Sequence, residues 1–377
     1  MADVSIVACK SYDSAEVSVA LKSALDAIGG LDWVHEGMNI AIKANLVTFA
    51  HPDEAVTTHP SLICELIKLL REKGANVVVG DSPGGLYNDV FLEKVYKVCG
   101  LYAVEKAGAK LNRDFSTATA HFDDAKVAKD FTYTAYLDSA DAIIDFCKLK
   151  THGMMGMSAA AKNMFGVIPG TMKPEYHFRY PDPADFARMI VDLDEYFKPR
   201  LCIVDAVVGM EGNGPTKGTP RTIGCIAAAE SPHKLDMLCA ALIGLSSEEI
   251  PTLLAARERG LVPDSIDEID IAGDYKPFVI SDYENISVKK SLLFDSRSKL
   301  FGKIARKALE ATPTLKKKDC RGCEKCRQIC PAQAITMKNG KPVIDRNKCI
   351  KCFCCQEFCP FGAMKVKRPL LARILTK

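Results

Sequence analysis

The chain of 377 residues contains 48% hydrophobic and 26% charged residues, which is the profile of a globular protein with two or three packed domains. It has no apolar run of about 18 residues, so the sequence predicts no transmembrane segment. The first residues lack the basic and apolar regions of a secretion signal, and we therefore expect a cytoplasmic protein.

The formal net charge of +3 hides an uneven distribution of charge along the chain. Residues 286–318 carry ten Lys and Arg against two acidic residues, and residues 363–377 carry five against none. Because the basic residues gather at this end without an interleaved aromatic platform, nucleic-acid binding is not expected. A basic end of this kind favours docking of an acidic partner.

Strand and helix patterns alternate along residues 1–285. Apolar runs predict strands at 4–9, 38–43, 76–80, 141–147, 201–208, 222–228 and 267–273. Between them, periodic patterns predict helices from Ser14 to Gly29 and at 61–73, 88–99, 183–197 and 232–243. Such alternation is typical of the α/β class, with a mostly parallel sheet and flanking helices. We expect one large α/β domain, with a division into two lobes as the alternative.

Polar residues cluster where the predicted strands end, which is where open parallel sheets bind their ligands. We expect catalytic roles for Lys150, His152, Lys162 and His177, with the histidines as general acids or bases. The residues expected to hold a substrate or cofactor are Lys43, Asn45, Asp81, Ser82, Gly84, Gly85, Lys148, Asn163, Asp205, Glu211 and Asn213. Lysines act as point charges, so this set predicts a pocket for a small anionic substrate or cofactor.

The C-terminal part repeats one cysteine spacing twice. The runs are Cys320-x2-Cys323-x2-Cys326-x3-Cys330-Pro331 and Cys349-x2-Cys352-x2-Cys355-x3-Cys359-Pro360. This spacing is typical of paired [4Fe–4S] clusters, in which the fourth cysteine of each run binds the other cluster. It predicts two clusters, one held by Cys320, Cys323, Cys326 and Cys359 and the other by Cys349, Cys352, Cys355 and Cys330. A zinc site or disulfides would not require this repeated spacing.

The cysteine segment resembles the bacterial two-cluster ferredoxins at every ligand position, and residues 334–345 resemble their short hairpin. The body resembles the iron–sulfur members of domain-of-unknown-function family 362. The matching motifs are IKANLV (42–47), THP (58–60), GDSPGG (80–85), KLKTH (148–152), KNMFGVIPG (162–170) and VDAVVGMEGNGPTKG (204–218). The resemblance implies a shared cleft built from these motifs and no particular activity. We expect a body at 1–285, a basic linker or helix at 286–318, a ferredoxin-type domain at 319–367 and a basic tail at 368–377.

Two functions compete for this arrangement. Clusters fused to a positive cleft favour a reductase that passes low-potential electrons to an anionic molecule. The alternative is a relay protein without catalytic activity, whose body recognises a redox partner. The basic end favours docking of an acidic electron carrier, such as a ferredoxin or a flavodoxin. The abundance of cysteine indicates an anaerobic cytoplasm. The sequence does not identify the substrate, the direction of electron flow, the oligomeric state, or any second organic cofactor or metal.

Overall fold

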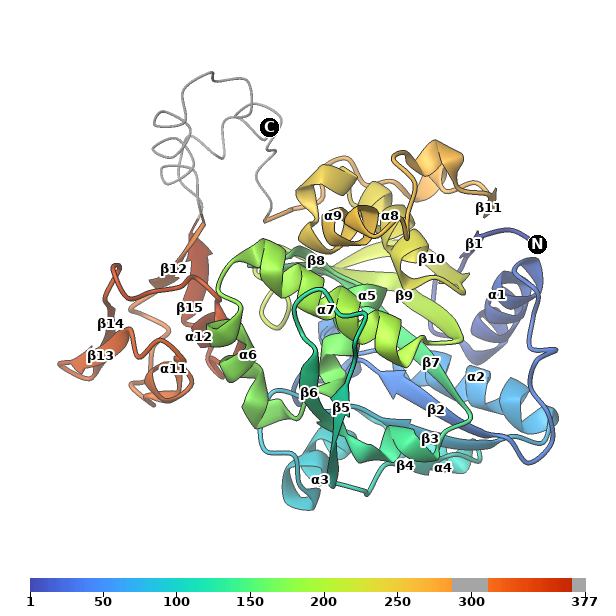
Figure 1. The fold of residues 1–377 in the computed structure, drawn as a ribbon, viewed down its shortest axis with the longest axis horizontal. Helices are drawn as coiled ribbons and strands as arrows, with labels where there is room; N and C mark the ends of the chain where they lie inside the picture. The colour runs from blue at the N-terminus through green and yellow to red at the C-terminus, as the bar shows by residue number, and fades with distance from the viewer. Residues whose placement is uncertain (287–310, 368–377) are drawn as a thin grey trace.

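A computed structural model describes residues 1–286 and 311–367. The basic stretch 287–310 and the tail 368–377, for which a linker helix and a basic tail were expected, lie outside the described residues. The described chain forms an α/β body and a smaller C-terminal module at one end of it (Figure 1).

A nine-stranded sheet runs through the body in the order β11-β1-β10-β9-β7-β2-β3-β4, with β8 paired to β7. The strands are β1 (Val4–Ala8), β2 (Asn39–Ala44), β3 (Asn76–Gly80), β4 (Lys110–Leu111), β7 (Ala142–His152), β8 (Gly156–Ser158), β9 (Leu201–Glu211), β10 (Thr219–Ala229) and β11 (Ile271–Ala272). Neighbours from β4 to β9 pair in parallel, whereas β10 is antiparallel to both β9 and β1. This confirms the predicted class, with strands from both ends of the body joined in one sheet.

Helices cover both faces of the sheet because its strands alternate apolar side chains between two cores. Ile40 and Ile42 of β2 pack into one core, while Ala41 packs into the other. The first core is closed by α1 (Ser14–Ala27), α2 (Pro60–Glu72), α3 (Asp89–Val98) and α4 (Ala103–Lys106). The second is closed by α5 (Ala160–Asn163), α6 (Lys173–Arg179), α7 (Pro183–Phe197), α8 (Pro232–Leu242) and α9 (Pro251–Glu258).

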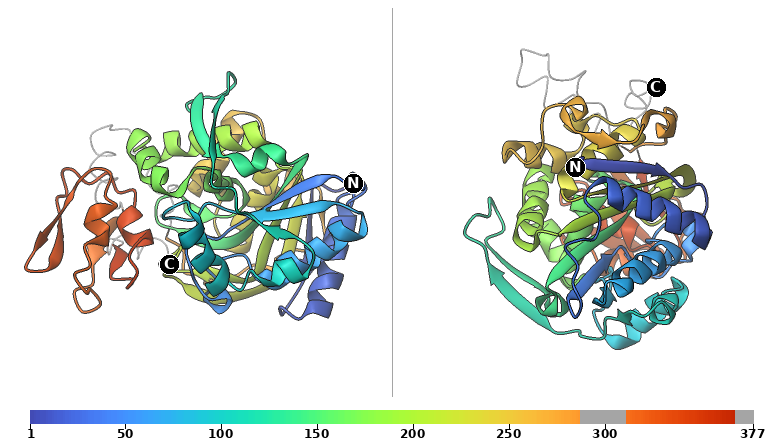
Figure 2. Two further views of the ribbon diagram at one scale, coloured as in Figure 1. Left: turned by 90° about the horizontal axis from the view of Figure 1, so that it is seen from below. Right: turned by 90° about the vertical axis from the view of Figure 1, so that its right-hand side faces the viewer.

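A two-stranded hairpin that the sequence did not predict projects from the body. Its strands β5 (Thr117–His121) and β6 (Asp130–Thr134) pair antiparallel and stand away from the main sheet (Figure 2). At the start of α1, the side chain of Asp13 rather than Ser14 caps the helix, accepting from the N–H groups of Ala15 and Glu16.

Two central strands are longer than the sequence predicts. The expected strand 141–147 continues to His152, and the expected strand 201–208 continues to Glu211. Antiparallel partners explain the extra length, because β8 pairs with the end of β7 and β10 pairs with the end of β9. Lys148, Lys150 and Asp205 therefore lie on strands and not in the exit loops where they were expected.

The C-terminal module consists of β12 (Thr312–Leu315), α11 (Lys325–Gln328), β13 (Ile335–Lys338), β14 (Lys341–Ile344), α12 (Cys354–Glu357) and β15 (Met364–Lys367). The pairing of β13 with β14 is the hairpin expected between the two cysteine runs. Because β12 pairs with β15, the module begins at Thr312, several residues before the boundary expected at 319.

Candidate functional site between the body and the iron–sulfur module

The eight cysteines of the two runs gather into two groups of four within the module. Cys320, Cys323, Cys326 and Cys359 line one cavity, while Cys330, Cys349, Cys352 and Cys355 line another. These are the same groups that the crossed spacing predicts. No three His, Cys, Asp or Glu side chains of the described ranges converge on a single metal ion. A cubane does not require such convergence, because each of its irons binds a different thiolate.

The backbone around the two cavities is repeated in the two halves of the module. Glu324 and Phe353, each directly after the second cysteine of a run, both have a left-handed backbone with φ values of 61° and 62°. After the fourth cysteine, the N–H of Ala334 donates to Cys330 Sγ at 3.3 Å and that of Ala363 donates to Cys359 Sγ at 3.2 Å. Donors aimed at sulfur stabilise thiolates, so the cysteine sets fit [4Fe–4S] clusters in donor type and hydrogen bonding.

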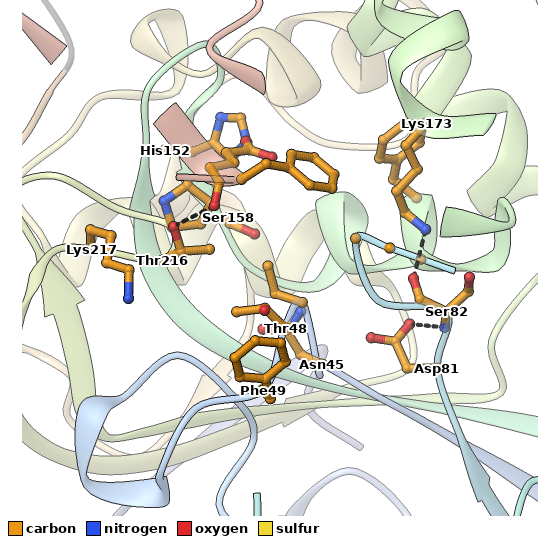
Figure 3. Close-up of a pocket in the computed structure, with 18 of the residues that line it drawn as sticks. Asn45, Thr48, Phe49, Asp81, Ser82, His152, Ser158, Lys173, Thr216 and Lys217 are labelled. Carbon is orange, nitrogen blue, oxygen red and sulfur yellow. Dashed lines mark hydrogen bonds and ion pairs between the residues drawn. The ribbon is translucent and has the colours of Figure 1, made fainter. Parts of the chain in front are cut away.

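A cavity of about 420 Å³ lies between the body and the module (Figure 3). Cys323 and Cys359 of the first cysteine group line it together with residues from the ends of the body strands. Among the predicted residues, it brings together Lys43, Asn45, Asp81, Ser82, Gly84, Gly85, His152, Lys162, Asn163 and His177. The second cysteine group is not part of this lining.

Glycines of the body make room for phenylalanines of the module. A Cβ on Gly84 would lie 2.8 Å from the ring of Phe358, and a Cβ on Gly153 would lie 3.1 Å from that of Phe353. Across the same interface, Gln356 Nε2 donates to the carbonyl of Asn213 at 2.9 Å, and the N–H of Val366 donates to Asn213 Oδ1 at 3.0 Å. Asn213 was expected to hold a cofactor, but these contacts make it part of the body–module interface.

His152 also contacts the module instead of facing the cavity with a free nitrogen. Its Nδ1 accepts from the N–H groups of Met154 and Met155 at 3.2 and 3.1 Å, which places the ring proton on Nε2. Nε2 lies 2.8 Å from Glu357 Oε1. Burial favours a raised pKa for Glu357, but the contact with His152 and the nearby Lys162 lower it to about 2. With both nitrogens engaged, His152 is a poor general base and fixes Glu357.

Lys43 is held in the cavity wall by a complete set of partners. Its ammonium lies 2.8 Å from Asp81 Oδ1 and donates to Asn163 Oδ1 at 3.0 Å and to the Ala44 carbonyl at 2.9 Å. Behind it, Asn163 Nδ2 donates to Asp145 at 2.6 Å, and burial raises the pKa of Asp145 to about 8. Lys43 therefore shapes the site but has no donor left for a ligand.

Lys148 and Lys150 lie behind the cavity instead of lining it. Lys148 Nζ lies 2.5 Å from Asp205 Oδ2 and donates to Tyr12 Oη at 2.8 Å. Lys150 Nζ donates to Asn45 Oδ1 at 2.5 Å and to the Val56 carbonyl at 2.7 Å. Burial and the nearby charge of Lys148 lower the pKa of Lys150 to about 7. Both lysines, and Asp205, support the strand ends rather than contact a ligand.

Glu211 is also outside the cavity lining. Its Oε2 accepts from the backbone N–H of Glu284 at 3.1 Å, and its Oε1 lies 3.7 Å from Arg221. These contacts attach the segment after α9 to the end of β9. The structure thus gives Glu211 a place in the packing of the body, and not in the site where it was expected.

Lys162 and Lys173 line the cavity from the body and keep donors available to a ligand, and the sequence predicted the first of them. Lys162 has no hydrogen-bond or ion-pair partner among the described residues, and its Nζ lies 4.6 Å from the ring centre of Phe165. Burial lowers the pKa of Lys162. Lys173, at the start of α6, donates to the carbonyls of Ser82 and Ile168 at 2.6 and 2.5 Å, and burial lowers its pKa to about 7 (Figure 3).

The sequence carried only weak signals for the remaining lining residues. Lys173 follows the KNMFGVIPG motif and precedes His177 by one helical turn, which could have placed it in the same group. His177, by contrast, was expected as a general acid or base; it lines the cavity but is buried with its ring stacked 4.3 Å from that of Phe186, and burial lowers its pKa to about 3. Glu357 and Phe358 belong to the module, and no local pattern connects them with a cavity in the body.

The comparisons with known proteins agree with this division of the chain. The family model described as domain of unknown function (DUF362) matches residues 40–241, and that described as a 4Fe-4S dicluster domain matches residues 312–360. Because the first match spans more than half of the chain, the protein belongs to the DUF362 family and carries an iron–sulfur domain of the ferredoxin type.

A thylakoid-associated protein of Synechocystis sp. is 30% identical over 268 residues, which cover 69% of this chain and 80% of that protein. Among solved structures, the lactate racemase apoprotein of Thermoanaerobacterium thermosaccharolyticum has a TM-score of 0.41 at 13% identity, covering 64% of this chain and 57% of its own. A Thermotoga maritima protein has a TM-score of 0.36 at 13% identity, covering 56% and 54%. Within the described ranges, no helix is long and apolar enough to cross a bilayer.

Proposed function

We propose that the protein is an oxidoreductase that transfers electrons between two [4Fe–4S] clusters and a small anionic molecule in the cavity. One observation carries this proposal: Cys323 and Cys359, from one predicted cluster, line the same cavity as Lys162 and Lys173. A cluster bound there would have two of its ligands at the cavity wall. Such a cluster would have the short separation from a bound molecule that electron transfer requires.

The two cysteine groups are the proposed ligand sets, with Cys359 crossing to the first run and Cys330 to the second. Each cluster when bound supplies one electron at low potential, so the pair suits a two-electron reduction that also consumes two protons. The N–H groups of Ala334 and Ala363, which donate to ligand sulfurs, support this assignment.

The proposed roles of the body residues follow from their free donors. Lys162 holds the anion, because its ammonium makes no ion pair within the described part of the chain, and Glu357, whose charge acts on it, is already paired with His152. Lys173 is the proposed proton donor, since a lysine with a pKa of about 7 is partly protonated and readily deprotonated near neutral pH. Lys43, which contacts both Asp81 and Asn163, holds this part of the cavity wall in place.

The second cysteine group lies away from the cavity and is the proposed point where electrons arrive. The module surface is basic, with exposed Lys316, Lys317, Lys318, Arg321 and Lys348. An acidic one-electron carrier, such as a ferredoxin or a flavodoxin, has the complementary charge. We propose a cytoplasmic location in an anaerobe. Because the Synechocystis relative is named as thylakoid-associated, fractionation of cells into membranes and cytoplasm tests this location directly.

The proposal is tested first on protein purified without oxygen. Iron and acid-labile sulfide are quantified, and the molecules released on denaturation are identified by mass spectrometry. About eight irons together with a stoichiometric organic anion would support the oxidoreductase. About eight irons with an empty cavity would favour the relay function without catalysis. About four irons or fewer would contradict the two ligand sets.

A further inference from the structure

The charge of the cavity lining is unbalanced in favour of cations. Its described residues include five lysines, Lys43, Lys162, Lys173, Lys217 and Lys325, against two carboxylates, Asp81 and Glu357. Both carboxylates already have a partner at 2.8 Å, Asp81 with Lys43 and Glu357 with His152. Lys325 also lines the cavity of the first cysteine group, and the side chain of Lys217 lies 3.4 Å from the position of a Cβ on Gly362, three residues after Cys359, so both can compensate the charge of a cluster. Lys162 and Lys173, from the body, are left for a ligand.

The donors of these two lysines define where an anion would bind. An ammonium has three N–H donors. Lys173 uses two of them on the carbonyls of Ser82 and Ile168, which leaves one, and Lys162 has all three free within the described part of the chain. An ammonium without an acceptor in a partly buried site is costly, so the site favours an oxygen anion that accepts from both lysines.

Another part of the cavity lining is apolar. Phe49, Phe91, Phe358 and Leu86 line it, and Phe49 and Leu86 remain 38% and 58% exposed. Phe49 and Phe91 meet edge to face with ring centres 6.2 Å apart. Large apolar side chains left open to solvent beside a polar pocket indicate a ligand with an apolar part, and aromatic walls favour a flat one.

The glycine-rich loop beside the lysines does not form a phosphate cradle. The N–H of Gly84 donates to the Val47 carbonyl at 2.6 Å, and that of Ser82 donates to Asp81 Oδ1 at 2.8 Å. Phosphate sites of the loop type require several backbone N–H groups pointing at the anion. With these donors used inside the protein, two lysine ammonium groups favour a carboxylate over a phosphate.

We propose that the cavity binds a flat organic carboxylate, an aryl or arylalkenoic acid, with its carboxylate on Lys162 and Lys173 and its apolar body between Phe49, Phe91 and Phe358. The volume of about 420 Å³ is sufficient for such a molecule. This inference deepens the proposed function, since the bound acid would be the anionic partner of the clusters. It concerns binding alone, however, and can be tested without turnover.

The test measures binding of four probes to the full-length, oxidised protein by calorimetry under anaerobic conditions. trans-Cinnamate has the proposed charge and shape, cinnamamide lacks the charge, propionate lacks the ring, and phenyl phosphate carries the alternative anion. We expect cinnamate to bind at least about tenfold more tightly than each of the other three. Equal affinity for the amide, equal affinity for propionate, or tighter binding of phenyl phosphate would overturn the inference.

Two variants locate the bound probe. Lys162→Met should weaken cinnamate binding about tenfold or more and leave cinnamamide unchanged, because only the charge is lost. Phe49→Ala should weaken cinnamate and cinnamamide alike. Lys68→Met, on α2 and outside the cavity lining, is the control and should change neither. Cinnamate affinity that is unchanged in Lys162→Met places the carboxylate elsewhere and contradicts the inference.

The two proposals fail in different ways. If cinnamate binds as expected but protein with eight irons transfers no electrons to any bound acid, the oxidoreductase proposal fails and the binding inference stands. If a different class of molecule is released from the purified protein and is reduced by it, the carboxylate inference fails and the oxidoreductase proposal stands. Each result is therefore informative about one proposal.

Discussion

Two groups of lysines at the same edge of the sheet differ in how fully their donors are used. Lys148 lies between Asp205, Tyr12 and the Val208 carbonyl, at 2.5, 2.8 and 3.1 Å, so all three N–H donors have an acceptor. Lys162 has no such acceptor among the described residues, and Lys173 has two. The comparison shows that a lysine near a strand end indicates a ligand site only when its partners are incomplete.

Lys150 is intermediate, because two of its three N–H donors have an acceptor. It shows that closeness to a strand end in the sequence does not identify a lysine that contacts a ligand. It is two residues from Lys148 on β7, so both side chains leave the same face of the strand. Its acceptors are Asn45 and a backbone carbonyl, with no carboxylate. Lys150 thus fixes Asn45, which does line the cavity, and affects a ligand only through that residue.

The largest effect on stability is expected where the lysine is fully paired. Lys148→Met removes one partner of a buried ion pair and leaves Asp205 uncompensated, so we expect a loss of about 3–5 kcal/mol in the free energy of unfolding. Urea unfolding of oxidised protein, followed by circular dichroism, measures the change. Lys68→Met at the half-exposed pair with Glu65 is the control and should cost about 1 kcal/mol or less. Equal losses in the two variants would remove the distinction between the two lysine groups.

A smaller effect is expected from the titration of Lys173. Its pKa is about 7 in the folded protein but about 10.4 in the unfolded chain. Between these values the unfolded chain binds one more proton, so Lys173 makes stability rise with pH, by at most about 1.4 kcal/mol per pH unit. Below pH 7 both states are protonated and the contribution is constant.

The measurement compares the wild-type protein with Lys173→Met from pH 6 to pH 9 by urea unfolding. The variant should show a flatter rise of stability above pH 7 than the wild type. Cinnamate provides a second readout, because an anion prefers protonated Lys173 and its affinity should fall as pH rises through about 7. Parallel pH profiles for the two proteins would mean that Lys173 does not titrate in this range.

The smallest effect on stability is expected at the lysine without a partner. Lys162→Met removes a partly buried charge without breaking an ion pair of the described residues, so the free energy of unfolding should stay within about 0.5 kcal/mol or rise. The same urea experiment gives the answer, and iron content serves as the check that the clusters assemble. A loss comparable with that of Lys148→Met would show that Lys162 has a structural role, and the proposed anion site would then be without its main residue.

By itself the sequence determined what depends on neighbours along the chain. Hydrophobic periodicity predicted the main strands and helices of the α/β body but missed the hairpin β5–β6 and helices α6 and α9. The cysteine spacing predicted the two groups of four that the fold brings together. Boundaries such as the end of β7 at His152 depended on a distant partner strand and were not predictable in this way.

The tertiary structure alone decided which residues form the cavity. His152 meets Glu357, Lys148 meets Asp205, and Gly84 receives Phe358, and each pair joins segments far apart in the chain. An ion pair or a close packing contact depends on distance in space, which residue types and their spacing do not encode. For this reason the sequence could name Lys43, Lys148, Lys150 and Lys162, but it missed Lys173 and could not tell which lysines the fold leaves free for a ligand.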